Sequence, residues 1–115
     1  DGEMTSGAAY LRSLGPEIVV VTQGEHGSYT LTGDTAFSTP AFQVPVVDTT
    51  GAGDVFHGAY LYGLLQGWDL VATAAFAGAT AALKCTQLGG RVAIPRLPQV
   101  LAFMEEHGSK HPMAR

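Results

Sequence analysis

The chain has 115 residues, of which 46% are hydrophobic and only 14% are charged, and its formal net charge is −4. This apolar content suffices for a packed core and excludes a disordered tail, while the length fits one domain or one piece of a larger one. Because Lys and Arg form no run, the composition argues against nucleic acids and anionic membranes as partners.

The chain carries a single cysteine, Cys85, so it can form no internal disulfide and suits a reducing cytoplasm. Its longest apolar stretch, residues 70–83, is shorter than the ~20 residues that a membrane-spanning helix needs. No secretory signal pattern stands at the start. Since the chain opens on Asp1 rather than methionine and enters a helical pattern at once, we expect an N-terminal part to be missing.

The first third of the chain predicts a helix, a strand and a hairpin, in that order. Apolar residues spaced for one helical face run through residues 5–14, and Gly15 ends the pattern. Residues 17–22 are mostly β-branched, which is typical of a strand buried on both faces of a parallel sheet. Alternating apolar and polar residues in 27–39, with a turn at Gly33, predict a hairpin.

The rest of the chain is predicted to be mainly helical. A helical period runs through residues 52–66, and Asp69 is the expected N-cap of a second helix that reaches residue 85. Pro98 lies in the first turn of a last helix, which Gly108 closes. Strands and helices in one layered unit place the chain in the α/β class. In the helix predicted at residues 52–66, one apolar face is shared by Val55, Ala59, Tyr62 and Leu65, with Phe56 and Tyr60 beside it.

A glycine-rich loop, "TGAGD" at residues 50–54, opens the helix predicted at residues 52–66. A helix N-terminus leaves backbone N–H groups unpaired and carries partial positive charge, and glycines let an anion approach that backbone closely. The loop therefore has the form of an anion-binding site. Asp54 falls in the first helical turn. A carboxylate beside an anion site makes sense if it accepts a proton from a hydroxyl that attacks a phosphoryl group.

Plainer interpretations stand beside this one. Gly51 and Gly53 can simply turn the chain while Asp54 caps the helix, as a generic Gly-x-Gly-Asp often does. The loop is not the Walker pattern of phosphate binding, because no Lys-Ser or Lys-Thr follows the glycines. It also differs from the dinucleotide-binding fingerprint in its glycine spacing and in the strand that precedes it.

Residues 48–61, "DTTGAGDVFHGAYL", resemble the C-terminal signature of the ribokinase-like (phosphofructokinase-B) carbohydrate kinases. Two further stretches fit the same family in order and spacing. One is the strand end in residues 19–29, with its Thr-x-Gly-x-x-Gly pattern, and the other is the Ala-rich helix followed by "QLGGRVAIP". The positions that fit the central signature are Asp48, Gly51, Ala52, Gly53, Asp54, Phe56, Gly58 and Ala59.

The resemblance implies the ribokinase-like three-layer α/β/α fold, of which residues 1–115 would be the C-terminal nucleotide-binding and catalytic part. It implies ATP-dependent phosphorylation of a sugar or sugar-like hydroxyl, with Mg²⁺. Asp54 would be the catalytic base that takes the proton from that hydroxyl. The residues whose backbone N–H groups would form the anion hole are Gly51, Ala52 and Gly53.

The same resemblance implies a nucleotide side and a cation site. The residues that would line the phosphates and ribose of ATP are Thr22, Gly24 and Gly27. Ala77 and Gly78 would lie beside the adenine, where small residues leave room for a flat ring. Asp48, with the backbone near Thr50 and Gly89, resembles the site of a monovalent cation such as K⁺ in many members.

The resemblance covers only the C-terminal part of the family, whose members are about twice this length or more, beyond a single domain of ~100–150 residues. Their N-terminal half supplies most of the sugar contacts, the lid and an Asn-x-x-Glu element linked to magnesium, none of which is visible in this sequence. Many relatives dimerise through the lid, so a homodimer is expected only of a full-length protein.

Three alternatives to a sugar kinase stay open. The signature fits equally a ribokinase-like kinase of a nucleoside or a vitamin alcohol. A non-catalytic module would bind nucleotide without turnover, although the retention of Asp54 argues against it. A structural fragment would fold only with its missing half. For five further residues, packing or solvation explains the side chain better than a functional role: His26, His57, Trp68, Cys85 and Arg91.

Overall fold

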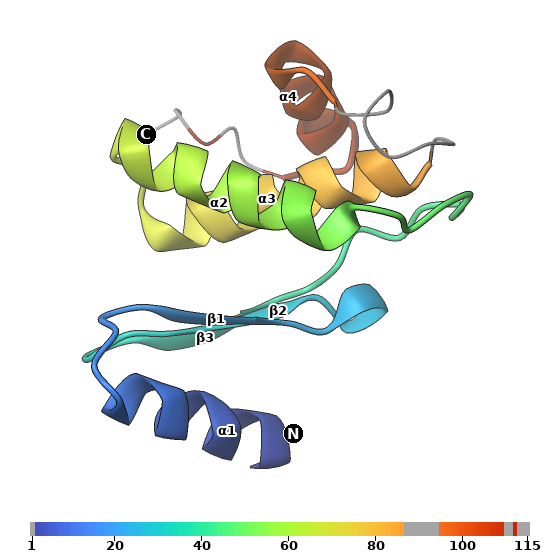
Figure 1. Ribbon diagram of the computed structural model, residues 1–115. Coiled ribbons are helices and arrows are strands. Elements are labelled where there is room, and N and C mark those ends of the chain that lie inside the picture. The colour runs from blue at the N-terminus through green and yellow to red at the C-terminus, as the bar shows by residue number, and fades with distance from the viewer. Residues whose placement is uncertain (1, 87–94, 110–111, 113–115) are drawn as a thin grey trace. The chain divides into compact units, whose positions relative to one another are not determined.

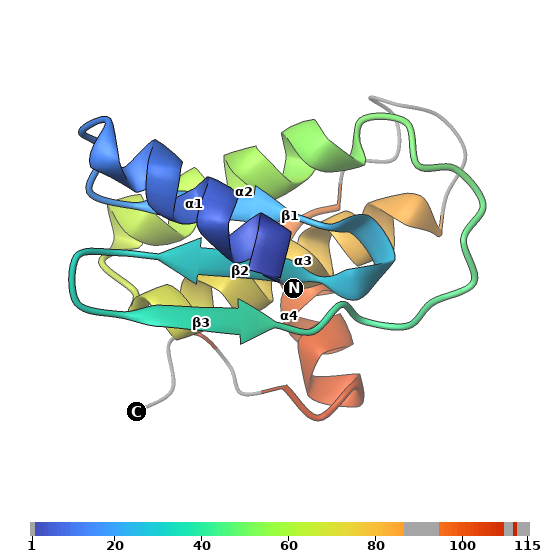
Figure 2. The same cartoon turned by 90° about the horizontal axis from the view of Figure 1, so that it is seen from below.

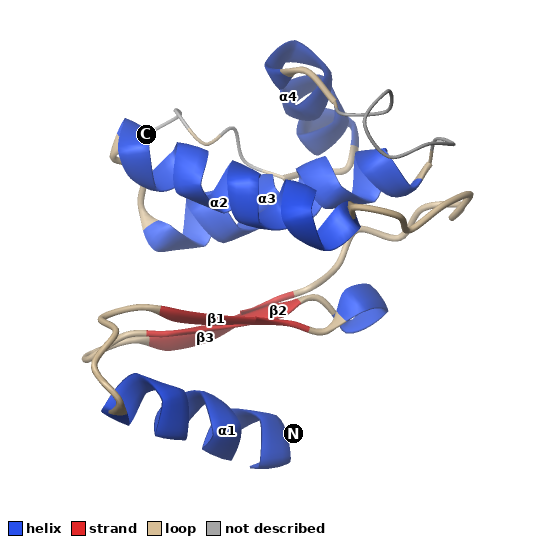
Figure 3. Ribbon diagram, in the orientation of Figure 1, coloured by secondary structure: helices blue, strands red, loops and turns tan. Residues whose placement is uncertain are grey.

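The computed structural model describes residues 2–86, 95–109 and 112. The chain divides into two compact units, residues 1–41 and residues 42–115. Figure 1 follows the elements along the chain, and Figure 3 separates the helices from the strands. The first unit contains α1 (Gly2–Ser13), β1 (Val19–Thr22), β2 (Ser28–Leu31) and β3 (Ala36–Thr39). The second unit contains α2 (Ala52–Gln66), α3 (Leu70–Cys85) and α4 (Leu97–Glu106).

The first unit holds a three-stranded antiparallel sheet in the order β1-β2-β3, with α1 along one of its faces (Figure 2). Leu31 of β2 stands opposite Val19 of β1 on one side and Ala36 of β3 on the other. The predicted hairpin is confirmed as β2 and β3. In the turn that joins them, the N–H of Thr32 donates to the carbonyl of Thr35 at 2.7 Å.

The strand β1 differs from the one that the sequence predicts. Its described neighbour, β2, runs antiparallel, and Val19 is the buried residue among its four. The expectation of a parallel strand buried on both faces is therefore wrong for the described sheet. The cause is the short connection through the 3₁₀ turn Gly24–His26, because parallel pairing needs a crossover of a dozen or more residues. The buried positions of β2 are polar, at Ser28 and Thr30.

The second unit is built on the packing of α2 against α3 (Figure 1). A Cβ added to Gly63 of α2 would lie 2.8 Å from the Thr73 side chain and 3.1 Å from Trp68. The missing side chain therefore lets the two helices approach closely. α4 packs in turn against α3, and buries Val100 and Met104.

The helix predicted at residues 52–66 is confirmed as α2, and of its predicted face Ala59 is buried, as are Phe56 and Tyr60 beside it. Leu65, which shares the predicted face, is 84% exposed. The close approach at Gly63 explains the difference, because packing selects the side of α2 that carries the small residue. The buried residues of α2 are Phe56, Ala59, Tyr60 and Gly63.

Local capping groups set the ends of these helices as the sequence predicts. The Asp69 carboxylate accepts the N–H of Ala72 at 2.7 Å and caps α3, and Gly67 ends α2 at a φ of +76°. Pro98 stands in the first turn of α4, and Gly108 follows that helix at a φ of +73°. None of the helices in the described ranges combines the length and the apolar character needed to cross a bilayer.

Candidate functional site

The loop that opens α2 turns through a left-handed glycine. Gly51 is the N-cap residue, with φ +78° and ψ 1°, a conformation that residues with side chains adopt only at a cost. A Cβ there would meet Lys84 Cε at 3.9 Å, which is an ordinary contact, so backbone conformation rather than lack of space explains the glycine. The Asp48 carboxylate braces the same turn by accepting the N–H of Thr50 at 2.9 Å.

The first turn of α2 offers open hydrogen-bond donors. The N–H of Ala52 donates to the Thr49 carbonyl at 3.1 Å, whereas the N–H groups of Gly53 and Asp54 have no backbone acceptor within the described part of the chain. These two donors, at the positive end of the helix dipole, can hold an anion. Of the predicted anion-hole residues, Gly53 thus presents an open N–H, and Ala52 has its N–H engaged in the turn.

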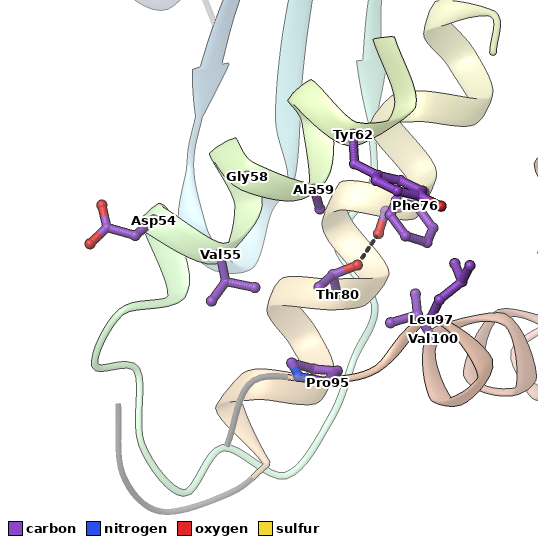
Figure 4. Close-up of a pocket in the computed structure, with 10 residues that line it drawn as sticks. All are labelled: Asp54, Val55, Gly58, Ala59, Tyr62, Phe76, Thr80, Pro95, Leu97 and Val100. Atoms are coloured by element: carbon purple, nitrogen blue, oxygen red, sulfur yellow. Dashed lines mark hydrogen bonds between the residues drawn. The ribbon is translucent and has the colours of Figure 1, made fainter. Parts of the chain in front are cut away.

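Asp54 stands at this same turn. Its side chain is exposed, and its carboxylate points away from the other side chains drawn in Figure 4. His57, one turn further, keeps its Nδ1 at 2.7 Å from the carbonyl oxygen of Gly53 in its own helix. The Asp54 carboxylate is therefore placed to accept a proton from a group that arrives at the start of α2.

The loop before α2 is fastened to the C-terminal end of α3. The N–H groups of Val47 and Asp48 both donate to the carbonyl oxygen of Cys85, at 2.7 and 3.1 Å. They satisfy a carbonyl of the kind that a helix end leaves unpaired. Burial raises the pKa of the Cys85 thiol, while the Lys84 ammonium lowers this pKa and the Asp48 carboxylate raises it further. Both charges therefore act at the same helix end.

A pocket of about 460 Å³ lies beside α2 (Figure 4). The Thr80 hydroxyl in its wall donates to the Phe76 carbonyl at 2.8 Å, which satisfies the hydroxyl within α3. The volume falls in the usual range of small-molecule sites, and the mainly apolar lining suits a flat apolar ring. The lining residues are Asp54, Val55, Gly58, Ala59, Tyr62, Phe76, Thr80, Pro95, Leu97 and Val100.

The residues predicted beside an adenine do not line this pocket, although they stand between two residues of α3 that do. Ala77 is fully buried, and Gly78 is half-buried with open space where its Cβ would be. Phe76 and Thr80 line the pocket instead, and the sequence interpretation missed both. Their spacing of four residues, with an aromatic and a small polar side chain on one helical face, was the available signal.

The predicted phosphate and ribose residues lie in the first unit, around the turn after β1. Gly24 and Gly27 have φ values of +55° and +91°, and Thr22 is the exposed last residue of β1. A Cβ on Gly27 would fall 2.0 Å from the carbonyl oxygen of Thr39, so β3 excludes any side chain there. The structure therefore brings these three residues to one turn. The close approach of β3 also explains the glycine at position 27 without any ligand.

The predicted cation site is described only in part. The Asp48 carboxylate is engaged with the N–H of Thr50, and Gly89, like Arg91, lies outside the described residues. In the ranges that the structure describes, no three His, Cys, Asp or Glu side chains gather where they could hold a metal ion. The assignment of Asp48 to a monovalent cation stays a prediction.

Residues 2–97 match the sequence profile of the pfkB family carbohydrate kinases. The chain belongs to this family. The aminoimidazole riboside kinase of Salmonella typhimurium is 37% identical over 103 residues, which cover 85% of this chain and 32% of that protein. The ribokinase from Thermotoga maritima superposes with a TM-score of 0.83 at 35% identity, over 87% of this chain and 34% of its own. A proposed ribokinase II from E. coli, in complex with ATP and Mg²⁺, gives a TM-score of 0.83 at 30% identity, over 86% of this chain and 32% of its own.

These comparisons confirm the family and the ribokinase-like α/β fold that the glycine motifs led us to expect. The chain spans about a third of the length of the relatives that it matches. The roles assigned to Asp54, to the anion hole and to the nucleotide side stay predictions.

Proposed function

We propose that the complete protein containing this chain is a kinase that transfers the γ-phosphoryl group of ATP to a hydroxyl of a sugar or sugar-like molecule. The observation that carries the proposal is the loop at Gly51, which places open N–H groups and the Asp54 carboxylate in one helical turn. An anion site and a proton acceptor in the same place are what phosphoryl transfer to a hydroxyl needs. Membership of the pfkB family supports the proposal.

In the proposed reaction Asp54 is the catalytic base. The substrate hydroxyl oxygen forms a bond to the γ-phosphorus, the bond from that phosphorus to the bridging oxygen of ADP breaks, and the hydroxyl proton moves to the Asp54 carboxylate. The backbone of Gly51, Ala52 and Gly53 is the proposed anion hole for the transferred group. Because the N–H of Ala52 donates to the Thr49 carbonyl, the open N–H of Asp54 is the donor that can take its place.

We propose that Mg²⁺ arrives at the loop together with the nucleotide. Mg²⁺ is commonly held by only one or two carboxylates together with substrate phosphates, so ATP would bring most of its ligands. When bound, Mg²⁺ would neutralise charge on the phosphate oxygens. ATP and Mg²⁺ occur together in the structure of the E. coli relative, which supports both. A monovalent cation such as K⁺ at Asp48 is a separate proposal, which the dependence of the rate on K⁺ tests.

We propose nucleotide-binding roles for residues within each unit, taken separately. The residues proposed for the phosphates and ribose are Thr22, Gly24 and Gly27. Ala77 and Gly78 are proposed to lie near the adenine. The apolar pocket beside α2, with Phe76 and Thr80 in its wall, supports a ring-binding surface on this part of α3.

The acceptor class divides into sugars and nucleosides. One relative is named a riboside kinase and another a ribokinase, so a ribose-containing alcohol is the first class to test. A vitamin alcohol, or a nucleotide-binding role without turnover, is the second candidate. A cytoplasmic location is a proposal that rests on the sequence, and a homodimer of the complete protein is one that rests on the family resemblance.

The test compares Asp54→Asn with the unaltered complete protein. We expect kcat with a ribose-containing acceptor to fall by roughly 10²–10⁴-fold, because the general base is lost, while calorimetric binding of Mg·ATP persists. NADH serves as the negative control for binding. Glu105→Gln, which removes an exposed carboxylate on α4, is the matched control and should leave kcat unchanged. An Asp54→Asn variant with the turnover of the unaltered protein would refute the mechanism.

A further inference from the structure

Lys84 is a buried lysine whose ammonium group is not engaged by the described residues. It lies in the last turn of α3, its side chain is 0% exposed, and its Nζ finds no partner in the described part of the chain. Lysine is almost never fully buried unless it is paired, because taking an ammonium out of water is costly. Neither the sequence interpretation nor the proposed reaction gives this side chain a role.

The Lys84 side chain extends to the loop that opens α2. Its Cε lies 3.9 Å from the position that a Cβ on Gly51 would take. The neighbouring carbonyl, of Cys85, accepts the N–H groups of Val47 and Asp48 from that same loop. The end of the Lys84 side chain therefore lies beside Gly51, the N-cap residue of the helix whose first turn carries the open N–H groups.

The full charges expected at this loop are mostly negative, so a positive side chain nearby would stabilise a bound anion. Asp48 and Asp54 are both carboxylates, and the proposed ligand brings the further negative charge of a phosphoryl group. Backbone N–H groups supply only partial positive charge. A buried ammonium acts with less screening than a surface one, since the surrounding dielectric is lower.

We propose that the Lys84 ammonium is the fixed positive charge of the phosphoryl-binding loop, and that it stabilises the anion held at the start of α2. The inference rests on the proposed function and adds a residue to it. Lys84 is a positioning residue in this scheme, because it acts on the anion through its field and through the loop backbone. The anion in turn offsets the cost of burying an ammonium that has no partner among the described residues.

The test separates binding of phosphate from binding of the nucleoside. In the complete protein, Lys84→Met keeps the long apolar stem and removes the charge. We expect the Kd for inorganic phosphate and for Mg·ATP to rise by ~10-fold or more, as loss of a charged partner does, while the Kd for adenosine stays unchanged. Lys84→Arg, which keeps the charge, should retain phosphate binding better than Lys84→Met.

The matched control is Thr73→Val. Thr73 is also fully buried on α3 with a hydroxyl that has no partner among the described residues, but it lies against Gly63 rather than against the loop. It should change neither Kd. If Lys84→Met does not fold, Lys84→Gln and Lys84→Arg give the same comparison of neutral with charged side chains.

Two outcomes would overturn the inference. One is a neutral Lys84 variant that binds inorganic phosphate as tightly as the unaltered protein. The other is an equal loss of affinity for phosphate and adenosine, which would mean general damage. Failure of the unaltered protein to bind Mg·ATP would instead refute the proposed function, so the two failures are distinguishable.

Discussion

Lys84 and Gly51 meet where α3 ends and α2 begins, with Lys84 Cε 3.9 Å from the Cβ position of Gly51. The glycine has a left-handed backbone that opens the first turn of α2, and the lysine places a buried side chain against it. The end of one helix thus supports the start of the other. Substitutions on either side of this contact should change both the stability of the loop and its affinity for anions.

Replacing Gly51 by alanine tests the left-handed turn. We expect Gly51→Ala to lower the free energy of unfolding by roughly 1–2 kcal/mol, because a side chain at φ +78° is strained, and to weaken phosphate binding. Urea denaturation and calorimetry measure the two effects. Gly58→Ala is the control, since Gly58 is an exposed helical position with open space around its Cβ, and it should be neutral or stabilising by about 0.5–1 kcal/mol. Equal stability of the two variants would contradict the prediction.

Gly27→Ala tests the close approach of the turn after β1 to β3. The new Cβ would fall 2.0 Å from the Thr39 carbonyl oxygen at a φ of +91°, so the backbone must move. We expect a loss of at least ~2 kcal/mol in the free energy of unfolding. Gly7→Ala, in α1, adds a Cβ that meets nothing within 4 Å and should not destabilise. If both variants unfold at the same urea concentration, the close approach of Gly27 to Thr39 does not affect stability and the prediction is wrong.

The thiol of Cys85 reports the charges at the end of α3. Burial raises its pKa, so its thiolate fraction at neutral pH is lower than that of a free cysteine, and alkylation by iodoacetamide should reach half of its maximal rate at a higher pH. Because the Lys84 ammonium lowers this pKa and Asp48 raises it, Lys84→Met should move the midpoint further up and Asp48→Asn should move it down. The denatured protein, with an ordinary cysteine, is the reference. A native midpoint below the denatured one would reverse the assigned sign.

The sequence allowed the helices of the second unit to be predicted because their signals are local. Asp69 caps α3 through its own carboxylate, and Gly67 ends α2 through its own φ. The pattern of Gly51, Gly53 and Asp54 is local in the same way, and the anion-binding turn that it suggests stays a prediction. In each case the residues that make the feature are a few positions apart in the chain.

Features that depend on packing between distant segments were missed. The partner of β1 and the exposure of Leu65 on α2 follow from which surfaces meet, which neither β-branching nor helical period determines. In the sequence Lys84 is an ordinary polar residue in the last turn of a helix, and its burial beside Gly51 appears only in the folded chain. The wall of the pocket, with Tyr62 and Phe76 from different helices, arises in the same way.

The shared carbonyl of Cys85 has a consequence for the motions of the loop. Val47 and Asp48 donate to it, so their amide protons become free to exchange with solvent only when these bonds to the end of α3 open. Helix ends open more readily than helix centres, and the loop is attached to such an end. Fraying of the last turn of α3 would therefore release the anion-binding turn as well, so the two should order and melt as one unit as the temperature changes.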